Sequence, residues 1–178
     1  MLRARLLRHP DTPCGAVTRI DVDLARGAGG VLGLRWTVLG RIAELAVPAP
    51  ALSRRGDRLW EHTCFEAFFA DEEGAAYSEL NVSPSREWAA YRFTGYRAGM
   101  QKAELPAPRI EVEAGEDRLE VRTALRLRAA GRRGLGLSAV IEEAGGAKSY
   151  WALAHPPGAP DFHHPDCFAL QLPPLGEG

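Results

Sequence analysis

The sequence predicts an all-β fold, a sandwich of about ten to twelve short strands. The first observation is that apolar and polar residues alternate along many short runs, the pattern of strands with one buried and one solvated face. The second is that residues typical of turns separate these runs over short spans, as in antiparallel sandwiches. Strands joined so closely favour hairpins over the long helical crossovers of a parallel sheet.

The alternation is clearest in four runs, at residues 19–24, 32–38, 118–125 and 135–141. In the second run, Leu34 and Trp36 alternate with Arg35 and Thr37, so one face is apolar. Turn-forming segments connect neighbouring strands at residues 71–74, 83–86, 114–117 and 143–147. Proline-rich stretches are expected to be loops within a single domain that spans residues 1–178.

The charge balance argues against a nucleic acid or a membrane as partner. The 178 residues include 22 basic and 23 acidic side chains, which gives a formal net charge of −1. Such a chain has no long-range attraction for DNA, RNA or an anionic lipid surface. We therefore expect a small molecule as the partner, while the sequence leaves the oligomeric state open.

The cysteines and the first residues predict a cytoplasmic protein. Cys14, Cys64 and Cys167 are odd in number and far apart, which is typical of reduced thiols rather than disulfides or a zinc site. The segment at residues 1–9 mixes charged and apolar residues and does not resemble a secretion signal.

The segment from Trp60 to Phe93 predicts two consecutive hairpins. If residues 71–74 form a four-residue loop, Glu66 faces Glu79 and the apolar face carries Phe65, Ala67, Phe69, Leu80 and Val82. A turn at residues 83–86 then places three further pairs opposite each other, Asn81 with Trp88, Glu79 with Ala90 and Tyr77 with Arg92.

Two interpretations of the resulting polar face remain open. It is either a solvated surface or a platform on which aromatic rings stack on a ligand while carboxylates and amides orient it. Facing carboxylates repel each other, and Arg92 is the cation expected to neutralise Glu79. Glu66 would then be the freer group, available to accept hydrogen bonds from a ligand.

Four of the five histidines, at positions 62, 155, 163 and 164, suggest a second polar cluster. Adjacent residues in extended backbone point to opposite faces, so His163 and His164 are poorly placed to share one ion. The sequence therefore predicts no metal site, and we expect these histidines to bond backbone or ligand.

Four segments of the chain resemble the bacterial DOMON-like domain proteins: residues 59–69 (LWEHTCFEAFF), 77–84 (YSELNVSP), 87–93 (EWAAYRF) and 160–168 (PDFHHPDCF). Their superfamily includes type 9 carbohydrate-binding modules and haem-binding DOMON domains. The resemblance implies an immunoglobulin-like sandwich of two antiparallel sheets, with a ligand on the concave face of one sheet.

The same resemblance implies particular residues. In the sugar-binding relatives two tryptophans clamp a sugar while acidic and amide groups bind its hydroxyls. Trp60 matches one clamp position, Trp151 is a candidate for the other, and Glu66 and Asn81 resemble the polar set. In the haem-binding relatives a methionine ligates the iron, which makes Met100 a candidate.

The sequence thus favours a non-catalytic module for a small, carbohydrate-type ligand, with no cofactor. The predicted binding residues are Trp60, His62, Glu66, Tyr77, Glu79, Asn81, Trp88, Arg92, Trp151 and His163. Three alternatives stay open: a haem-binding electron-transfer module, a protein-interaction module, and a glycosidase-like enzyme. The last would need carboxylates about 5 Å apart.

Overall fold

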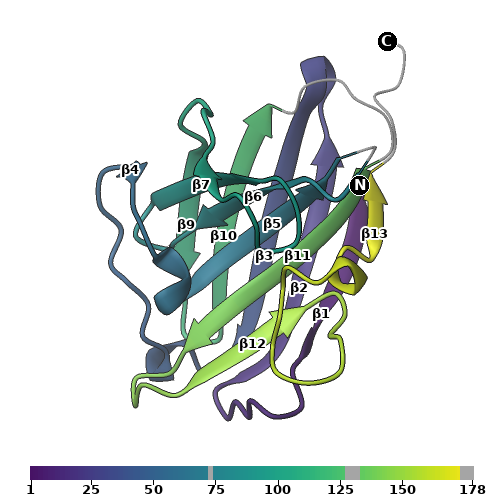
Figure 1. Cartoon of the computed structure of the whole chain (residues 1–178). Coiled ribbons are helices and arrows are strands. Elements are labelled where there is room, and N and C mark those ends of the chain that lie inside the picture. Colours follow the sequence, from purple (N-terminus) through teal and green to yellow (C-terminus); the bar gives the residue numbers. More distant parts are fainter. Residues whose placement is uncertain (72–73, 127–132, 173–178) are drawn as a thin grey trace.

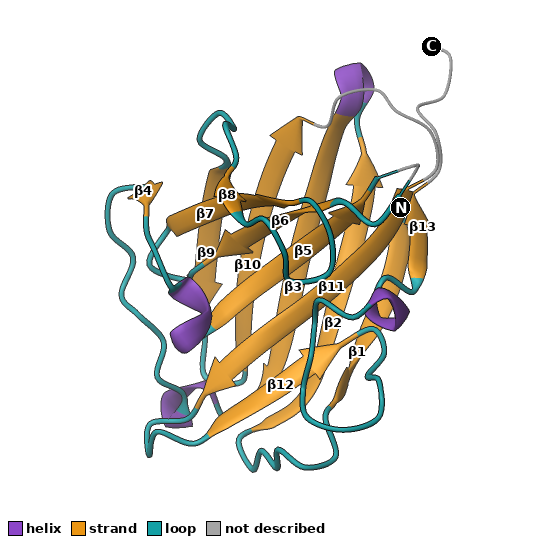
Figure 2. Cartoon of the chain, viewed as in Figure 1, coloured by secondary structure: helices purple, strands orange, loops and turns teal. Residues whose placement is uncertain are grey.

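The computed structural model describes residues 1–71, 74–126 and 133–172, which form thirteen β-strands and four short 3-10 helices, with no α-helix among them (Figure 1; Figure 2). The strands are β1 (Leu2–Arg8), β2 (Val17–Arg26), β3 (Val31–Gly40), β4 (Arg54–Arg55), β5 (Cys64–Ala70), β6 (Tyr77–Val82), β7 (Glu87–Phe93), β8 (Gln101–Lys102), β9 (Arg109–Ala114), β10 (Arg118–Arg126), β11 (Arg133–Glu142), β12 (Lys148–Ala152) and β13 (Leu170–Leu172). The helices are η1 (Ala28–Gly30), η2 (Ile42–Glu44), η3 (Leu59–Glu61) and η4 (Pro165–Cys167).

The all-β prediction is confirmed. Thirteen described strands exceed the expected ten to twelve because β4, β8 and β13 are only two or three residues long. None of the helices in the described part of the chain has the length and hydrophobicity that a membrane span requires.

The strands form one strongly curled sheet rather than the two separate antiparallel sheets that were expected. Eleven of the described strands follow the order β4-β7-β6-β5-β11-β12-β1-β2-β3-β10-β9, while β13 pairs with β11 and β8 pairs with β7. Strand β1 joins the two halves, because residues 2–6 pair with β2 and residues 7–8 pair with β12. The sheet is also mixed, since β4 runs parallel to β7.

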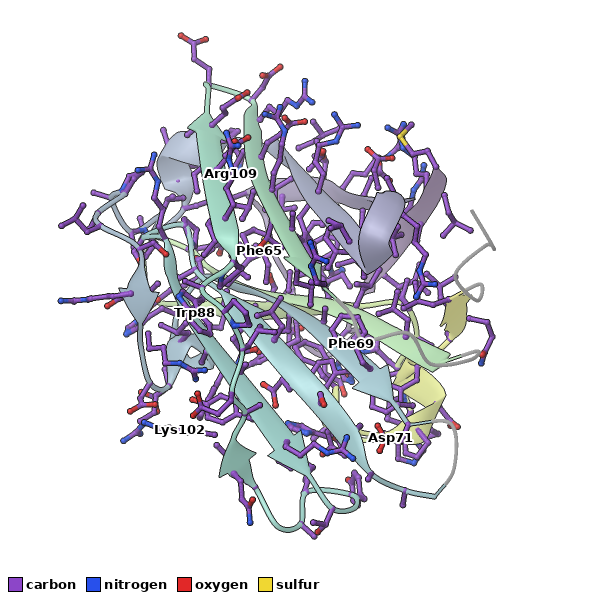
Figure 3. The ribbon with its side chains drawn as sticks, turned by 90° about the horizontal axis from the view of Figure 1, so that it is seen from above. Phe65, Phe69, Asp71, Trp88, Lys102 and Arg109 are labelled. Atoms are coloured by element: carbon purple, nitrogen blue, oxygen red, sulfur yellow. The ribbon has the colours of Figure 1, made fainter. Side chains whose placement is uncertain are left out.

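The main core lies where the curled sheet packs against itself. In Figure 1, β5, β6, β7, β11 and β12 lie in front of β1, β2, β3, β9 and β10; we call these the front and back layers. The rings of Trp36 on β3 and Phe65 on β5 are 5.7 Å apart, and Figure 3 shows Phe65 and Phe69 between the layers. Burial of the predicted apolar set (Phe65, Ala67, Phe69, Leu80 and Val82) is confirmed.

The first hairpin keeps the predicted faces but changes the partners. Glu66 lies opposite Asn81 and Phe68 lies opposite Glu79, so the facing of Glu66 with Glu79 was wrong. The last pair of the ladder is Ala70 with Tyr77, which leaves a longer connection than the four residues assumed. A shift of two residues preserves the strand alternation, so Glu66 and Glu79 still share one face as diagonal neighbours.

In the second hairpin the strand pairing differs from the predicted pairing by one residue. The backbone N–H of Ser83 donates a hydrogen bond to the backbone carbonyl oxygen of Glu87. Arg86, between them, adopts a left-handed φ of 70°. This three-residue turn places Asn81 opposite Ala89, one residue away from the expected pairing with Trp88. Because a one-residue slip exchanges the two faces, Trp88 turns into the core.

The outward face of the front layer is covered. The loop between β7 and β8 and the long segment between β12 and β13 both lie over it (Figure 2). Residues on this face form a second apolar cluster of Leu59, Cys64, Phe68, Tyr77, Ala89, Tyr91, Phe93, Val140, Ala152 and Phe162. The face is therefore a second packed layer with a pocket in it, and Tyr77 is only 2% exposed.

Candidate functional site

A pocket of about 340 Å³ opens on the outward face of the front layer. Glu66 from β5 and Glu79 from β6 line it, together with side chains from η3, the β7–β8 loop and the segment after β12. The volume lies at the lower end of the range for small-molecule sites.

Two buried carboxyl groups belong to this pocket. Glu66 is 3% exposed and Glu79 is 5% exposed. The Ser138 hydroxyl donates to Glu66 Oε2 at 3.0 Å, and Asn81 Nδ2 donates to Glu79 Oε1 at 2.8 Å. Among the described residues neither carboxyl forms an ion pair. The two acids are therefore held by neutral donors.

Burial raises the pKa of both acids, because charge is costly away from water. Burial and then the negative charge of Glu79 raise the pKa of Glu66 to about 8, and burial raises that of Glu79 to about 7. Both values lie well above the 4.5 of a solvated glutamate, so the pair retains a proton at neutral pH.

Arg97 and Asp161 tie together two loops above the acids. Arg97 Nη2 lies 2.7 Å from Asp161 Oδ1, and the Arg97 backbone N–H donates to the Tyr77 hydroxyl at 3.2 Å. The Tyr77 hydroxyl also bonds His163 Nδ1 at 2.8 Å. Burial lowers the pKa of His163 to about 4, so the ring is neutral and Nδ1 can accept the Tyr77 proton.

Aromatic rings line the rest of the pocket. Trp60, Phe93, Tyr150 and Phe162 all contribute to its surface. Phe93 stacks on Tyr77 with ring centres 4.6 Å apart, and Tyr150 lies 5.9 Å from Phe162. Trp60 is half-buried and packs edge-on against Tyr91 at 5.8 Å. These contacts hold flat apolar surfaces beside the acids.

Six of the predicted binding residues come together here. Trp60, Glu66, Glu79 and His163 line the pocket. Tyr77 supports it by bonding His163, and Asn81 supports it by bonding Glu79. The Asn81 Oδ1 atom is buried and has no hydrogen-bond partner in the described structure.

The other four predicted residues lie elsewhere. Trp88 and Trp151 belong to the main core, where the Trp151 indole N–H bonds Ser149 Oγ at 2.9 Å. Arg92 faces away from Glu79, and its guanidinium binds Asp71 at 2.8 Å. His62 is exposed and its Nδ1 lies 2.7 Å from Glu142. The one-residue difference in the pairing of the second hairpin explains why Trp88 and Arg92 lie on the opposite face from the one predicted.

Sequence reasoning missed six of the residues that line the pocket, which are Phe93, Arg97, Val140, Tyr150, Pro160 and Phe162. Phe93 would have been found with the correct three-residue turn, since it shares a face with Tyr77. Phe162 lies within the histidine-rich segment that the sequence did single out. Tyr150 alternates with the core residue Trp151 along β12, so strand alternation places it on the outward face. Arg97 carries no local signal, because its place depends on how the β7–β8 loop folds over the sheet.

Haem does not fit this pocket well. Met100 and His163 both line it, as a pair of axial ligands would. However, Glu66 and Glu79 line the same pocket, and an apolar macrocycle would cover these buried carboxyl groups without offering them a hydrogen-bond partner. Among the described residues no group of three or more His, Cys, Asp or Glu side chains could hold a metal ion.

The fold resembles that of a solved protein for which carbohydrate binding has been proposed. A structure from Bacteroides uniformis ATCC 8492, whose proposed role is carbohydrate binding, aligns with a TM-score of 0.63 at 16% identity, over 94% of this chain and 84% of that one. The two chains share a fold. At that identity, the likeness by itself carries no function.

Weaker matches are family 9 carbohydrate-binding modules from Caldicellulosiruptor kristjanssonii. The complex with cellotriose gives a TM-score of 0.49 at 11% identity, over 83% of this chain and 70% of that one. The complex with glucose gives 0.48 at 10% identity, over 83% and 72%. No family model matches the chain. No curated protein matches it either.

Proposed function

We propose that this protein is a non-catalytic module that binds a small carbohydrate-type ligand in the pocket above Glu66 and Glu79. The observation that carries the proposal is the combination of buried carboxyl groups with aromatic walls in one small pocket. Such a site offers hydrogen bonds to hydroxyl groups and flat surfaces to a sugar ring.

The ligand contacts follow from the geometry. A sugar ring would pack against Trp60 and Tyr150, which are both half-buried and so present part of their rings. Its hydroxyls would reach Glu66 and Glu79, which have oxygen atoms beyond those already bonded. The fold shared with the Bacteroides uniformis protein is consistent with this role.

Binding is favoured over glycoside hydrolysis. A retaining glycosidase needs one ionised carboxylate as nucleophile and one protonated acid, at a separation of about 5 Å. Here the two acids are diagonal neighbours rather than a facing pair, and burial raises the pKa of both. The pair shares a proton near neutral pH, so the preference for binding rests on this diagonal placement of the two acids.

The proposed binding set is smaller than the sequence predicted and partly different. It keeps Trp60, Glu66, Tyr77, Glu79, Asn81 and His163, and it adds Phe93, Arg97, Tyr150 and Phe162. A cytoplasmic location is also part of the proposal, since Cys14, Cys64 and Cys167 are all free thiols.

The test is isothermal titration of the protein with monosaccharides and disaccharides. Trp60→Ala should weaken binding of a sugar ligand about tenfold or more, because it removes a stacking surface. His62→Ala is the control, since His62 lies near Trp60 in the chain but is exposed and paired with Glu142. Absence of binding by every sugar, or equal losses in both variants, would contradict the proposal.

A further inference from the structure

The chain treats its buried acids in two different ways. Five acidic side chains are buried among the described residues: Asp21, Asp23, Glu66, Glu79 and Glu120. The three on the back layer each have at least two arginine partners, which are Arg5 and Arg19 for Asp21, Arg3 and Arg35 for Asp23, and Arg35, Arg118 and Arg122 for Glu120. Of these five described acids, only Glu66 and Glu79 in the pocket have no arginine partner.

Arg97, the cation nearest to Glu66 and Glu79, does not form an ion pair with either of them in the described structure. Arg97 is close enough to lower the pKa of both acids slightly, but its guanidinium is paired with Asp161 at 2.7 Å. Its side chain is also 52% exposed. His163 is neutral, so it adds no positive charge. A buried acid pair without a cation is costly to ionise.

The remaining titratable groups around the pair do not supply a cation either. Cys64 lies two residues before Glu66 on the same face of β5. Burial raises the pKa of its thiol well above the usual range, so the thiol stays neutral. Burial also raises the pKa of the Tyr77 and Tyr91 hydroxyls. Asp57, next to Tyr91, is paired with Lys102 at 2.9 Å.

Asn81 places a third acceptor beside the two acids, below the residues that line the pocket. It lies opposite Glu66 in the ladder, and its Nδ2 bonds Glu79. Its Oδ1 is fully buried and unpaired in the described structure, which is unusual for a buried amide. An ammonium group has three N–H donors, and two carboxyl groups with one amide oxygen would accept all three.

We propose that the ligand of this pocket is an amino sugar or a closely similar hydroxylated ring that carries a protonated primary amine. The ammonium group binds Glu66, Glu79 and Asn81, and the ring lies between the aromatic walls. Aromatic faces also attract a cation, which favours the same class of ligand. This inference rests on the proposed function and narrows it.

Proton release follows from the same arrangement. The free pair holds a proton at neutral pH, because burial raises the pKa of both acids. A bound ammonium stabilises the ionised pair, so the proton leaves to solvent on binding. A neutral sugar gives no such release. Affinity for the amine should therefore rise with pH until the amine itself loses its charge.

The test compares glucose, glucosamine and N-acetylglucosamine, and the matching galactose series, by isothermal titration at about pH 6.5, where the amine is charged. Titration in two buffers of different ionisation enthalpy gives the number of protons released. The amine should bind about tenfold or more tightly than the neutral sugar of the same ring, and with proton release. Equal affinity without proton release overturns the inference but leaves the proposed function standing. No binding by any of these six sugars, nor by the other monosaccharides and the disaccharides of the first titration, overturns both.

Two isosteric variants locate the effect. Glu66→Gln and Glu79→Gln should each reduce the preference for the amine over the neutral sugar about tenfold. Glu61→Gln is the matched control, because Glu61 follows Trp60 but pairs with Arg58 outside the pocket. If one variant fails to fold, the other and the wild-type sugar series still decide. A preference that survives both substitutions contradicts the inference.

Discussion

The two outer faces of the curled sheet carry similar residues but use them differently. On the back layer, Arg3 Nε lies 2.6 Å from Asp23 Oδ1, and hydrogen bonds from Arg3 and Arg35 lower the pKa of Asp23 to about 2. On the front layer, burial raises the pKa of Glu66 and Glu79. The back face exposes its arginines to water, whereas loops cover the front face.

This difference separates structural acids from available ones. An acid with two arginine partners has no unmet electrostatic need, and the pair contributes to stability. An acid held by one neutral donor in a covered pocket can still gain from a ligand. Strand alternation alone predicts polar side chains on the outer face of both layers. Whether a buried acid is structural or available to a ligand depends on its ion-pair partners and on the loops that cover it.

The largest effect should show that the front face is packed like a core. Phe68 points outward from β5, yet it is 1% exposed and packs on Phe168 at 5.8 Å. Phe68→Ala should therefore lower the free energy of unfolding by about 3–5 kcal/mol, as for a core phenylalanine. Denaturant unfolding measures it, with the true core variant Phe65→Ala as reference. A loss below about 1 kcal/mol would mean that the front face is ordinary surface.

The next effect concerns pH. The folded pKa values of Glu66 and Glu79 are raised above 4.5, so the folded state holds protons that the unfolded chain has released. Their contribution to stability is full below about pH 4.5 and is lost as the pH rises through about 8. Each pKa unit of these rises corresponds to about 1.4 kcal/mol, so the decline in stability should be large enough to measure.

Thermal melts between about pH 5 and pH 9 measure that loss. The double variant Glu66→Gln with Glu79→Gln should remove most of the decline, because glutamine does not titrate. The contribution of Asp23 to stability should have the opposite pH dependence, because its folded pKa is lowered: it is lost as the pH falls through about 2. A wild-type protein that is equally stable across this range would contradict the raised pKa values.

A smaller effect is expected on the back face. Asp23→Asn removes the bonds to Arg3 and Arg35 and should destabilise the protein by about 1–2 kcal/mol, since Arg3 is exposed and the pairs are screened. Glu66→Gln should cost less than that near neutral pH, because Glu66 is then largely protonated. Denaturant unfolding of both variants compares the faces directly. A larger loss from Glu66→Gln would reverse the assignment of structural and available acids.

The strand alternation predicted which residues share a face, and it did so even where the partners were wrong. Glu66, Tyr77, Glu79 and Asn81 stayed together because the first hairpin shifted by two residues. The second hairpin shifted by one, since a left-handed residue at Arg86 lengthens the turn, and no residue type there signals it.

Contacts between segments far apart in the sequence could not be predicted from local residue patterns. The joining of the two halves through β1 depends on the twist of the whole sheet. The pocket walls come from segments around Arg97 and Phe162, whose distance along the chain from β5 and β6 gives no periodic signal. The sequence therefore predicted the acids of the candidate site but not the cover that buries them.

A ligand that binds in the front-face pocket should change the tryptophan indole signals, which are the most direct test of where binding occurs. The chain has four tryptophans, of which Trp36, Trp88 and Trp151 are buried in the core and Trp60 lines the pocket. Titration with the sugars above, followed by nuclear magnetic resonance of the indole N–H groups, should move the Trp60 signal and leave the other three in place; Trp60→Phe assigns the signal. If Trp60 stays fixed with every sugar, or if Trp88 or Trp151 moves instead, the pocket is not the binding site.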